Sequence, residues 1–411
     1  MLTVVFGPIK TELQTNPTRA FACVNASFEC LPQRSSQLVF GGFSLAPFDG
    51  FSKKAKTTMP MTFTTCISAQ DFGLASETMI PGFQASQLSC AAPAQVVPVD
   101  PCHVFDESFQ QDLVLWWTWP DTRIPLYIAG PTGCGKTTSV LQFLARVHVP
   151  VISLTCSRRF VKDDLVGRWG AHEGGFAWID GPATIAWKTG AVLLINEFSL
   201  APPEVWVGAN DIFEGQSITI EKTGLSIPRH VNTRVIVTDN CRCGTLPESA
   251  YSSRNQQDAS TCDRFWHMAA DWPKPEVEAR IVLYRCERIA QGALSSETLA
   301  ELARCASRLA QASRTNPALK ADFVSEDVPA ALSTRVVIRL CEILTQLLAG
   351  SCSPEQSLSR AVRLAIGSAL NDRACLTLLE MAAFHFAPLL ETLHSSTAAN
   401  RRRRNVRPKI G

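Results

Sequence analysis

Residues 130–137 read GPTGCGKT, which fits the pattern G-x-x-x-x-G-K-[ST] of a phosphate-binding loop. A short β-type run from Pro125 to Ala129 precedes the loop, and the residues from Thr137 to Val147 are expected to form a helix. Glycines let backbone N–H groups curl around phosphates, and the helix start adds the positive end of its dipole. The strand, loop and helix together predict a nucleotide-binding site.

Two side chains of the loop carry most of the expected chemistry. Lys136 should reach the β- and γ-phosphates of ATP, and Thr137 should offer its hydroxyl to Mg²⁺. The predicted nucleotide-binding residues are Gly130, Pro131, Thr132, Gly133, Cys134, Gly135, Lys136, Thr137 and Thr138.

A second candidate motif is the apolar run that starts at Leu193 and ends in Asn196-Glu197. In nucleotide-hydrolysing sites of this kind, a first acidic residue holds Mg²⁺ through water and a second polarises the attacking water. Glu197 can perform the second task. Asn196 keeps an oxygen for a water-mediated contact with Mg²⁺ but lacks the charge.

Two later residues are further candidates. Asn240 ends the β-type run VIVTDN (235–240) and could hold the attacking water beside the γ-phosphate. Arg264 lies in CDRFW (262–266), between an acid and aromatic residues. An arginine in such surroundings is more often a structural ion pair than a catalytic group, so a role for Arg264 in hydrolysis would require a neighbouring subunit.

The hydrophobic pattern separates an α/β region from a helical one. Besides the strand before the loop, strands are expected at 149–155, 191–195 and 233–238, and a helix at 105–119. Strands that alternate with helices predict a parallel sheet with crossover connections. From about residue 276 the pattern is helical, and helices are expected at 276–293, 296–313, 333–348 and, with breaks, 358–394.

Composition sets broad limits. The chain has 411 residues with 46% hydrophobic and 18% charged residues, which is typical of a soluble globular protein of two or three domains. The net charge of +2 indicates neither nucleic acid nor an acidic surface as a partner. No apolar run reaches the roughly 18 to 20 residues of a membrane span. The start lacks a secretory signal, so a cytoplasmic location without membrane association is expected.

Two local features leave alternatives open. The C-terminal tail contains Arg401 to Arg404, Arg407 and Lys409, for which a solvated tail is the common interpretation and nucleic-acid binding the alternative. Most of the fifteen cysteines are expected to be reduced. A zinc site at Cys241 and Cys243 would have to recruit His230 and Cys262 in space, and is the minority interpretation.

The ordered motifs resemble the AAA+ ATPases of the MoxR group, with the closest likeness to the CobS-like branch, the ATPase subunit of aerobic cobaltochelatase and its relatives. The likeness covers about residues 70–390. The segments that carry it are DFGL…ETMIPGF (71–83), VPVDPCHVFD (97–106), GPTGCGKTT (130–138), DDLVG (163–167), LLINE (193–197), VTDN (237–240), DRFW (263–266) and LSTR (332–335).

The resemblance implies an α/β fold: an AAA+ P-loop NTPase αβα core with a parallel sheet, followed by a C-terminal helical lid domain. It also implies a homo-oligomeric ring, usually a hexamer, with ATP at the subunit interfaces. The corresponding division is an N-terminal extension (1–60), a lead-in segment (61–104), the nucleotide-binding domain (105–275), the lid domain (276–395) and a basic tail (396–411), which we expect to be disordered.

The resemblance also implies residue roles. By position, Glu197 matches the residue that activates water, and Asn240 matches the polar sensor on the fourth strand. Arg264 matches the finger that a neighbouring subunit supplies, and Arg335 matches the lid arginine that senses the γ-phosphate. A guanidinium that neutralises charge in the transition state agrees with phosphoryl transfer in general.

Two segments look like the inserted hairpins of this family, residues 172–190 and 215–230. The first typically faces the pore of the ring. Its Phe176 and Trp178 could grip a partner or could simply pack the hairpin.

Members of the group usually work with a partner that bears a von Willebrand A-type domain and remodel or activate a client protein. An ATP-hydrolysing ring chaperone is therefore the first hypothesis, and a true cobaltochelatase subunit is a narrower form of it. Because Asn196 is neutral, a nucleotide-dependent scaffold with negligible hydrolysis is the alternative. A nucleic-acid motor rests only on the basic tail and is the weakest of these hypotheses.

Overall fold

The computed structural model describes residues 63–75, 78–83, 94–172, 175–245, 253–315, 331–350, 353–366 and 369–405. The chain divides into two units at Thr58, and every described residue belongs to the second, Thr58–Gly411. The N-terminal extension and residues 406–411 of the basic tail, with Arg407 and Lys409, lie outside the described residues. The division of the second unit into lead-in, nucleotide-binding and lid domains stays a prediction.

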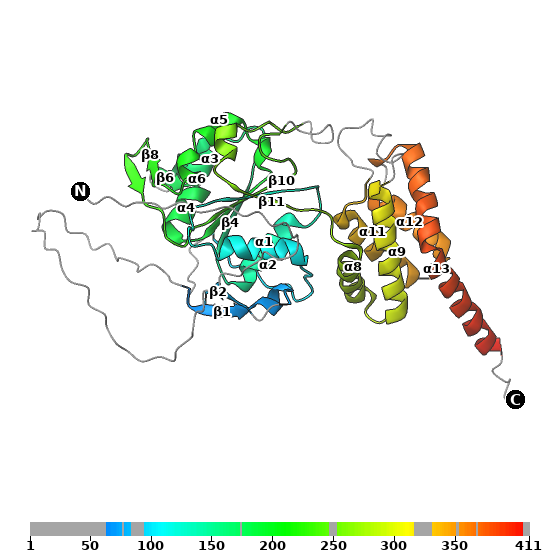
Figure 1. The fold of residues 1–411 in the computed structure, drawn as a ribbon. Coiled ribbons are helices and arrows are strands. Elements are labelled where there is room, and N and C mark those ends of the chain that lie inside the picture. The colour runs from blue at the N-terminus through cyan, green and yellow to red at the C-terminus, as the bar shows by residue number, and fades with distance from the viewer. Residues whose placement is uncertain are drawn as a thin grey trace, which may run out of the picture. The chain divides into compact units, whose positions relative to one another are not determined.

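A five-stranded parallel sheet forms the centre of the nucleotide-binding region, in the order β11-β3-β10-β7-β4 (Figure 1). Its strands are β3 (Leu126–Ala129), β4 (Val151–Thr155), β7 (Val192–Asn196), β10 (Val235–Asp239) and β11 (Trp266–Ala269). Every residue of β7 and β10 is buried, as expected for apolar strands covered on both faces. The sequence predicted four of these strands within a few residues but missed β11.

Successive residues of the strands feed two different cores. Leu194 packs with helices α1 (Glu107–Trp117) and α2 (Lys136–Arg146), whereas its neighbour Ile195 packs with α4 (Pro182–Thr189) on the other face. Figure 1 shows the sheet between these helices, which is the predicted αβα arrangement. The remaining short helices of this region are α3 (Lys162–Val166), α5 (Pro203–Val207), α6 (Asn210–Phe213) and α7 (Ala259–Cys262), with 3-10 turns at Ala69–Phe72 and Phe198–Leu200.

Three two-stranded hairpins accompany the sheet. The first pairs β1 (Thr65–Ser68) with β2 (Met79–Gly82) in the lead-in segment, and Trp117 donates its indole N–H to the Pro81 carbonyl at 2.8 Å. The other two hairpins are β5 (Gly167–His172) with β6 (Gly175–Asp180), and β8 (Ile218–Ile220) with β9 (Leu225–Ile227).

The hairpin predicted at 172–190 is partly wrong in its bounds. The β5–β6 hairpin begins at Gly167, because this last residue of the DDLVG segment already pairs with Asp180 of the second strand, and residues 182–189 form helix α4 instead. Phe176 is 80% exposed, and Trp178 lies edge-on against Trp169 and donates to Asp180. The hairpin therefore presents one aromatic side chain to solvent and packs the other.

The described residues from 275 onward are mostly helical, as predicted. The helices are α8 (Pro275–Ala290), α9 (Ser296–Thr315), α11 (Thr334–Leu348), α12 (Pro354–Ile366) and α13 (Asp372–Asn405), and they share a core of Leu, Val, Ala and Cys side chains. Within α13, the segment Asp372–Ser395 is long and apolar enough by length and composition to cross a membrane. It is weak evidence for a span, because Leu378 and Phe386 of this segment are buried in the helical core.

The cysteines in the described residues show one cross-link. Cys243 and Cys262 form a disulfide that joins the loop after β10 to α7, whereas the buried Cys241 is not part of a disulfide. Within the described residues, no cluster of three or more His, Cys, Asp or Glu side chains could hold a metal ion. The zinc alternative is therefore wrong for this part of the chain, because two of its sulfurs are bonded to each other.

Candidate nucleotide site

The loop between β3 and α2 has the compact geometry that phosphate binding requires. Helix α2 begins at Lys136, one residue earlier than predicted, and Gly135 before it has φ of 102°. A side chain at Gly130 would place its Cβ 2.2 Å from the Ala270 carbonyl oxygen, so only glycine lets β11 approach the loop. At Gly133, φ is 72° and a Cβ would lie 2.9 Å from Ser333 at the start of α11. The loop is thus packed between two other segments.

Lys136 is folded onto its own loop. Its ammonium donates to the carbonyls of Gly130 at 2.7 Å and Pro131 at 2.9 Å, and to the Asn240 side-chain oxygen at 3.1 Å. Burial lowers the pKa of Lys136, an effect that nearby Glu197 and Asp239 oppose. Anionic phosphates would replace these neutral acceptors with charged ones, which bind an ammonium more strongly.

Hard oxygen ligands gather beside the start of α2. The Thr137 hydroxyl donates to the Asn196 side-chain oxygen at 3.0 Å, and the Thr238 hydroxyl donates to the same oxygen at 2.9 Å. Hydroxyl and amide oxygens suit Mg²⁺, which is usually held by few protein ligands together with substrate phosphates. Thr137 and Asn196 therefore fit the predicted metal position.

The surroundings of Asn196 explain why an amide, and not a carboxylate, suits this position. Its nitrogen donates to the Ser153 hydroxyl at 2.9 Å and to the Leu154 carbonyl at 3.1 Å, both on β4. A carboxylate has no hydrogen to offer the Leu154 carbonyl. The amide thus ties β7 to β4 and turns its oxygen toward Thr137, and sequence reasoning had not anticipated this bond.

Glu197 follows β7 in a left-handed conformation with φ of 58°, which is unusual for a residue with a side chain. Its N–H donates to the Thr238 carbonyl at 2.9 Å and so fixes the backbone. Strained backbone of this kind is concentrated at functional sites. The Glu197 side chain is 38% exposed, and it is turned toward Lys136 and Asn240 across a small cavity.

This cavity brings together most of the predicted site. Among the described residues, those that line it are Thr132, Gly133, Gly135, Lys136, Thr137, Thr138, Glu197, Thr238, Asp239, Asn240 and Arg335. A second cavity of about 370 Å³ adjoins it and shares Gly133, Gly135, Thr138 and Arg335. The helical region therefore contributes Arg335 to both cavities, and its role as the lid arginine stays a prediction.

The second cavity is also bordered by the lead-in segment. His103 lines it, and the Nε2 atom of this residue is buried without a hydrogen-bond partner in the described part of the chain. Burial and the charge of Arg146 lower the pKa of His103 to about 4, so its imidazole is neutral at physiological pH.

Arg264 is not among the residues that line either cavity. Its guanidinium pairs with Glu214 at 2.7 Å and donates to the Ser260 carbonyl, and its side chain is 27% exposed. In the described chain the arginine therefore forms the ion pair that the sequence analysis gave as its commoner meaning. A role at a neighbouring subunit stays a prediction.

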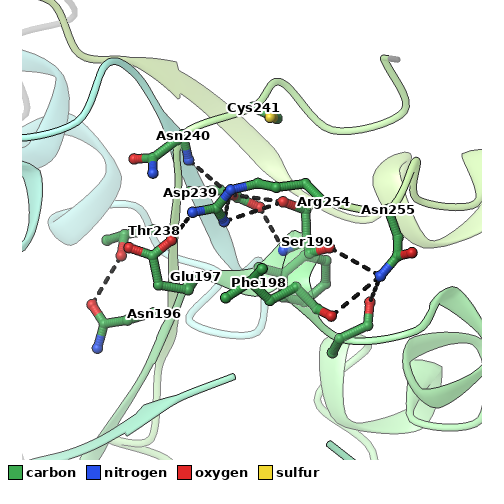
Figure 2. Close-up of polar contacts among 12 residues, drawn as sticks. Asn196, Glu197, Phe198, Ser199, Thr238, Asp239, Asn240, Cys241, Arg254 and Asn255 are labelled. Atoms are coloured by element: carbon green, nitrogen blue, oxygen red, sulfur yellow. Dashed lines mark hydrogen bonds and ion pairs between the residues drawn. The ribbon is translucent and has the colours of Figure 1, made fainter. Parts of the chain in front are cut away.

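Sequence reasoning missed two charged residues beside Glu197. Asp239 ends β10 within the VTDN motif, so its place next to Asn240 was a signal that could have been used. Arg254 lies between motifs and carried no such signal. Figure 2 shows its guanidinium between the carboxylates of Glu197 and Asp239.

Comparison with known proteins identifies the fold of this region. Residues 125–265 match the model of the AAA domain, dynein-related subfamily. The protein CbbQ of Hydrogenophilus thermoluteolus is 31% identical over 163 residues, which covers 39% of this chain and 58% of CbbQ. The protein NorQ of Paracoccus denitrificans is 30% identical over 160 residues, 39% of this chain and 57% of NorQ.

A longer match extends beyond the length of the AAA domain. The gas vesicle ATPase GvpN1 of Halobacterium salinarum is 24% identical over 275 residues, 62% of this chain and 76% of GvpN1. The chain spans less than two thirds of the length of CbbQ and NorQ. None of these relatives distinguishes the CobS-like branch, which stays a prediction. Residues 125–265 are thus similar to the AAA domain of the dynein-related subfamily, and membership of the chain in the MoxR group stays a prediction.

Proposed function

We propose that this protein is an ATP-hydrolysing AAA+ ring ATPase that acts as a chaperone or remodelling motor on a partner protein. The observation that carries the proposal is the single cavity lined by Lys136, Thr137, Glu197, Asn240 and Arg335. Each of these side chains has the chemistry that phosphoryl transfer from ATP to water requires. Glu197 and Asn240 follow two different strands, and the other three lie at the starts of two helices.

The residues divide the reaction among themselves. Lys136 would leave its loop carbonyls to bind the β- and γ-phosphates. Thr137, together with Asn196 through a water, would hold Mg²⁺, which would neutralise phosphate charge. Asn240 orients the attacking water, and Glu197 takes its proton. The water oxygen bonds to the γ-phosphorus while the bond to the bridging oxygen breaks, which leaves ADP and phosphate.

The proposal of a ring is supported by Arg264, because this arginine does not line the cavity of its own chain. Arg264 is partly exposed and paired with Glu214, from which a neighbouring subunit's nucleotide could draw it away. We propose a homo-oligomer, with six subunits as the expected number, and a von Willebrand A-domain partner. A cytoplasmic location remains our prediction. CbbQ, NorQ and GvpN1 do not identify the client of this chain.

Steady-state ATPase assays test the proposal, with the oligomer mass measured for each variant. We expect the wild type to hydrolyse ATP, and Lys136→Ala to lose both nucleotide binding and hydrolysis. Arg264→Ala should hydrolyse slowly alone and recover activity when mixed with Lys136→Ala subunits, because each variant then supplies what the other lacks. Absence of recovery in mixed rings would contradict the position of Arg264 in trans.

A second candidate function is a nucleotide-dependent scaffold with negligible hydrolysis. Two observations favour it: Asn196 brings no negative charge to the metal position, and Glu197 is bonded to Arg254. Wild-type hydrolysis no faster than that of Glu197→Gln, together with assembly that depends on ATP, would establish the scaffold instead. A cobaltochelatase subunit would differ only in its partner, which copurification from the native source would identify.

A further inference from the structure

Arg254 joins two carboxylates that lie on different strand ends. One branch of its guanidinium donates to Asp239 at 2.7 Å and to the Ser199 hydroxyl at 3.3 Å, and the other branch donates to Glu197 (Figure 2). The Arg254 side chain is only 7% exposed. Burial disfavours its charge, but Asp239 and Glu197 outweigh burial and raise the pKa of Arg254, so the guanidinium stays charged.

Asp239 provides a rigid anchor for this arginine. Its side chain is fully buried, and it accepts hydrogen bonds from the Tyr127 hydroxyl at 3.0 Å and from the Asn240 N–H at 2.7 Å. It also accepts from both the N–H and the hydroxyl of Ser199, at 2.6 and 2.9 Å. These donors and one branch of the Arg254 guanidinium already satisfy the Asp239 carboxylate. The second branch of Arg254 is therefore not needed to balance the charge of Asp239.

The backbone around Glu197 is held by the same segment. Asn255 does not line the cavity. Its backbone N–H donates to the Ser199 carbonyl at 2.7 Å, and its side-chain amide donates to the Leu200 carbonyl at 3.2 Å. Arg254 and Asn255 thus bind the turn that follows Glu197 through both charge and backbone. A rigid frame of this kind is what a precisely placed functional group needs.

Arg254 lies outside the small cavity that Glu197 lines. Glu197 and Asp239 line the small cavity, whereas Arg254 is not among the described residues that line it. The guanidinium therefore binds one carboxylate oxygen of Glu197, Oε2, from outside the cavity. The other carboxylate oxygen of Glu197 stays available to a water in the cavity.

We propose that Arg254 is a positioning residue for ATP hydrolysis, which clamps Oε2 of Glu197 to the Asp239 anchor so that Oε1 faces the attacking water. The proposal rests on the proposed function, because it assigns Arg254 a role in the reaction that Glu197 performs. A base that is oriented by a third, fixed group is a general arrangement in enzymes. Without the clamp, the side-chain torsions of Glu197 are free to turn its carboxylate away from the water.

Two substitutions at position 254 test the clamp. Arg254→Met keeps the apolar stem but removes both branches, and we expect kcat to fall about 10- to 100-fold, since misplacing a catalytic group by about 1 Å costs this much. KM for ATP and the affinity for a fluorescent ADP analogue should stay unchanged, because Arg254 does not line the cavity. Arg254→Lys, which can reach one carboxylate but not form a fork, should lose less than Arg254→Met.

A double-mutant comparison separates positioning from general damage to the fold. If Arg254 acts through Glu197, then Arg254→Met should lower kcat no further in a Glu197→Gln background, because the group that it orients is already lost. Arg123→Met removes an arginine from an exposed ion pair with Asp121 and is the matched control, with unchanged kcat expected. Urea unfolding of each variant shows whether the protein is folded in the assay.

Each outcome bears on one of the two proposals. Wild-type activity equal to Glu197→Gln would overturn the proposed function and this inference with it. An active wild type with equally active Arg254→Met would overturn the inference alone. An equal further loss in the Glu197→Gln background, or a rise in KM without a fall in kcat, would also overturn it. If Arg254→Met does not fold, Arg254→Lys in the two backgrounds provides the same comparison.

Discussion

Two buried arginines make similar ion pairs in very different surroundings. In the helical region, Arg314 of α9 binds Glu278 of α8 through two branches, at 2.6 and 3.2 Å, and stacks on Trp272 at 4.3 Å. Thr334 of α11 donates to the same glutamate at 2.7 Å. In the AAA domain, Arg254 binds Asp239 and Glu197.

The two ion pairs differ in how exposed the glutamate partner is. Both arginine side chains are almost fully buried, at 6% for Arg314 and 7% for Arg254. Glu278 is completely buried, whereas Glu197 is 38% exposed to a cavity. An enclosed pair can only hold three helices together, while a pair with one carboxylate open to a cavity is available for chemistry.

The largest effect should come from the open pair. We expect Glu197→Gln to lower the rate of ATP hydrolysis by about 10²- to 10⁴-fold, the usual contribution of a general base. The free energy of unfolding should change by less than about 0.5 kcal/mol, because the amide still accepts a bond from Arg254. Steady-state ATPase assays measure the rate of hydrolysis, and urea unfolding measures the free energy of unfolding. A large loss of stability would mean that the pair is structural after all, as in the helices.

The enclosed pair should show the opposite behaviour. Arg314→Met leaves Glu278 without its charged partner, and we expect about 3–5 kcal/mol of lost stability in urea unfolding. The double variant Arg314→Met with Glu278→Leu should recover most of the loss, since no buried charge is left alone. The kcat of folded Arg314→Met should stay within a factor of two or so of the wild type. A fall in kcat without loss of stability would remove the distinction between the two arginines.

Asn196→Asp sharpens the comparison at the cavity itself. The added charge should lower the Mg²⁺ concentration needed for hydrolysis and leave the rate equal or faster. The Leu154 carbonyl loses its hydrogen-bond donor, so the free energy of unfolding should fall by about 1–3 kcal/mol. Mg²⁺ titrations of ATPase activity and urea unfolding measure both effects. An unchanged Mg²⁺ dependence would count against the metal position at Asn196.

The smallest effect should come from an exposed pair, Arg123 with Asp121. Hydrogen bonds from Arg123 lower the pKa of Asp121 from 3.8 to about 2, but both side chains are more than a third exposed. Because the folded-state pKa is lowered, the stabilisation is present above pH 3.8 and is lost as the pH falls toward 2. We expect Asp121→Asn to cost less than about 1 kcal/mol at pH 7. Urea unfolding at pH 7 and at pH 3 should show this difference shrinking in acid.

The local motifs were readable because each is contiguous and carries its own conformation. The loop at 130–137, the strand that ends in Asn196-Glu197 and the helices up to residue 348 were predicted close to their observed bounds. Helix α13 instead continues to Asn405, through residues 396–405 of the tail that was expected to be disordered. The short strand β11 was missed, since its four residues include His267 and do not stand out from the DRFW segment. The hairpin at 167–180 was displaced because pairing, not composition, determines where a hairpin begins.

What the amino-acid sequence indicated by itself is which groups are proposed to meet a nucleotide: Lys136, Thr137 and Glu197, each at a strand or helix end. Only the tertiary structure shows which residues hold these groups in position. Arg254 comes within bonding reach of Glu197 because parallel strands β7 and β10 end at the same edge of the sheet and the chain returns across that edge. Such contacts join residues far apart along the chain, and no local pattern of hydrophobicity or turn residues encodes them.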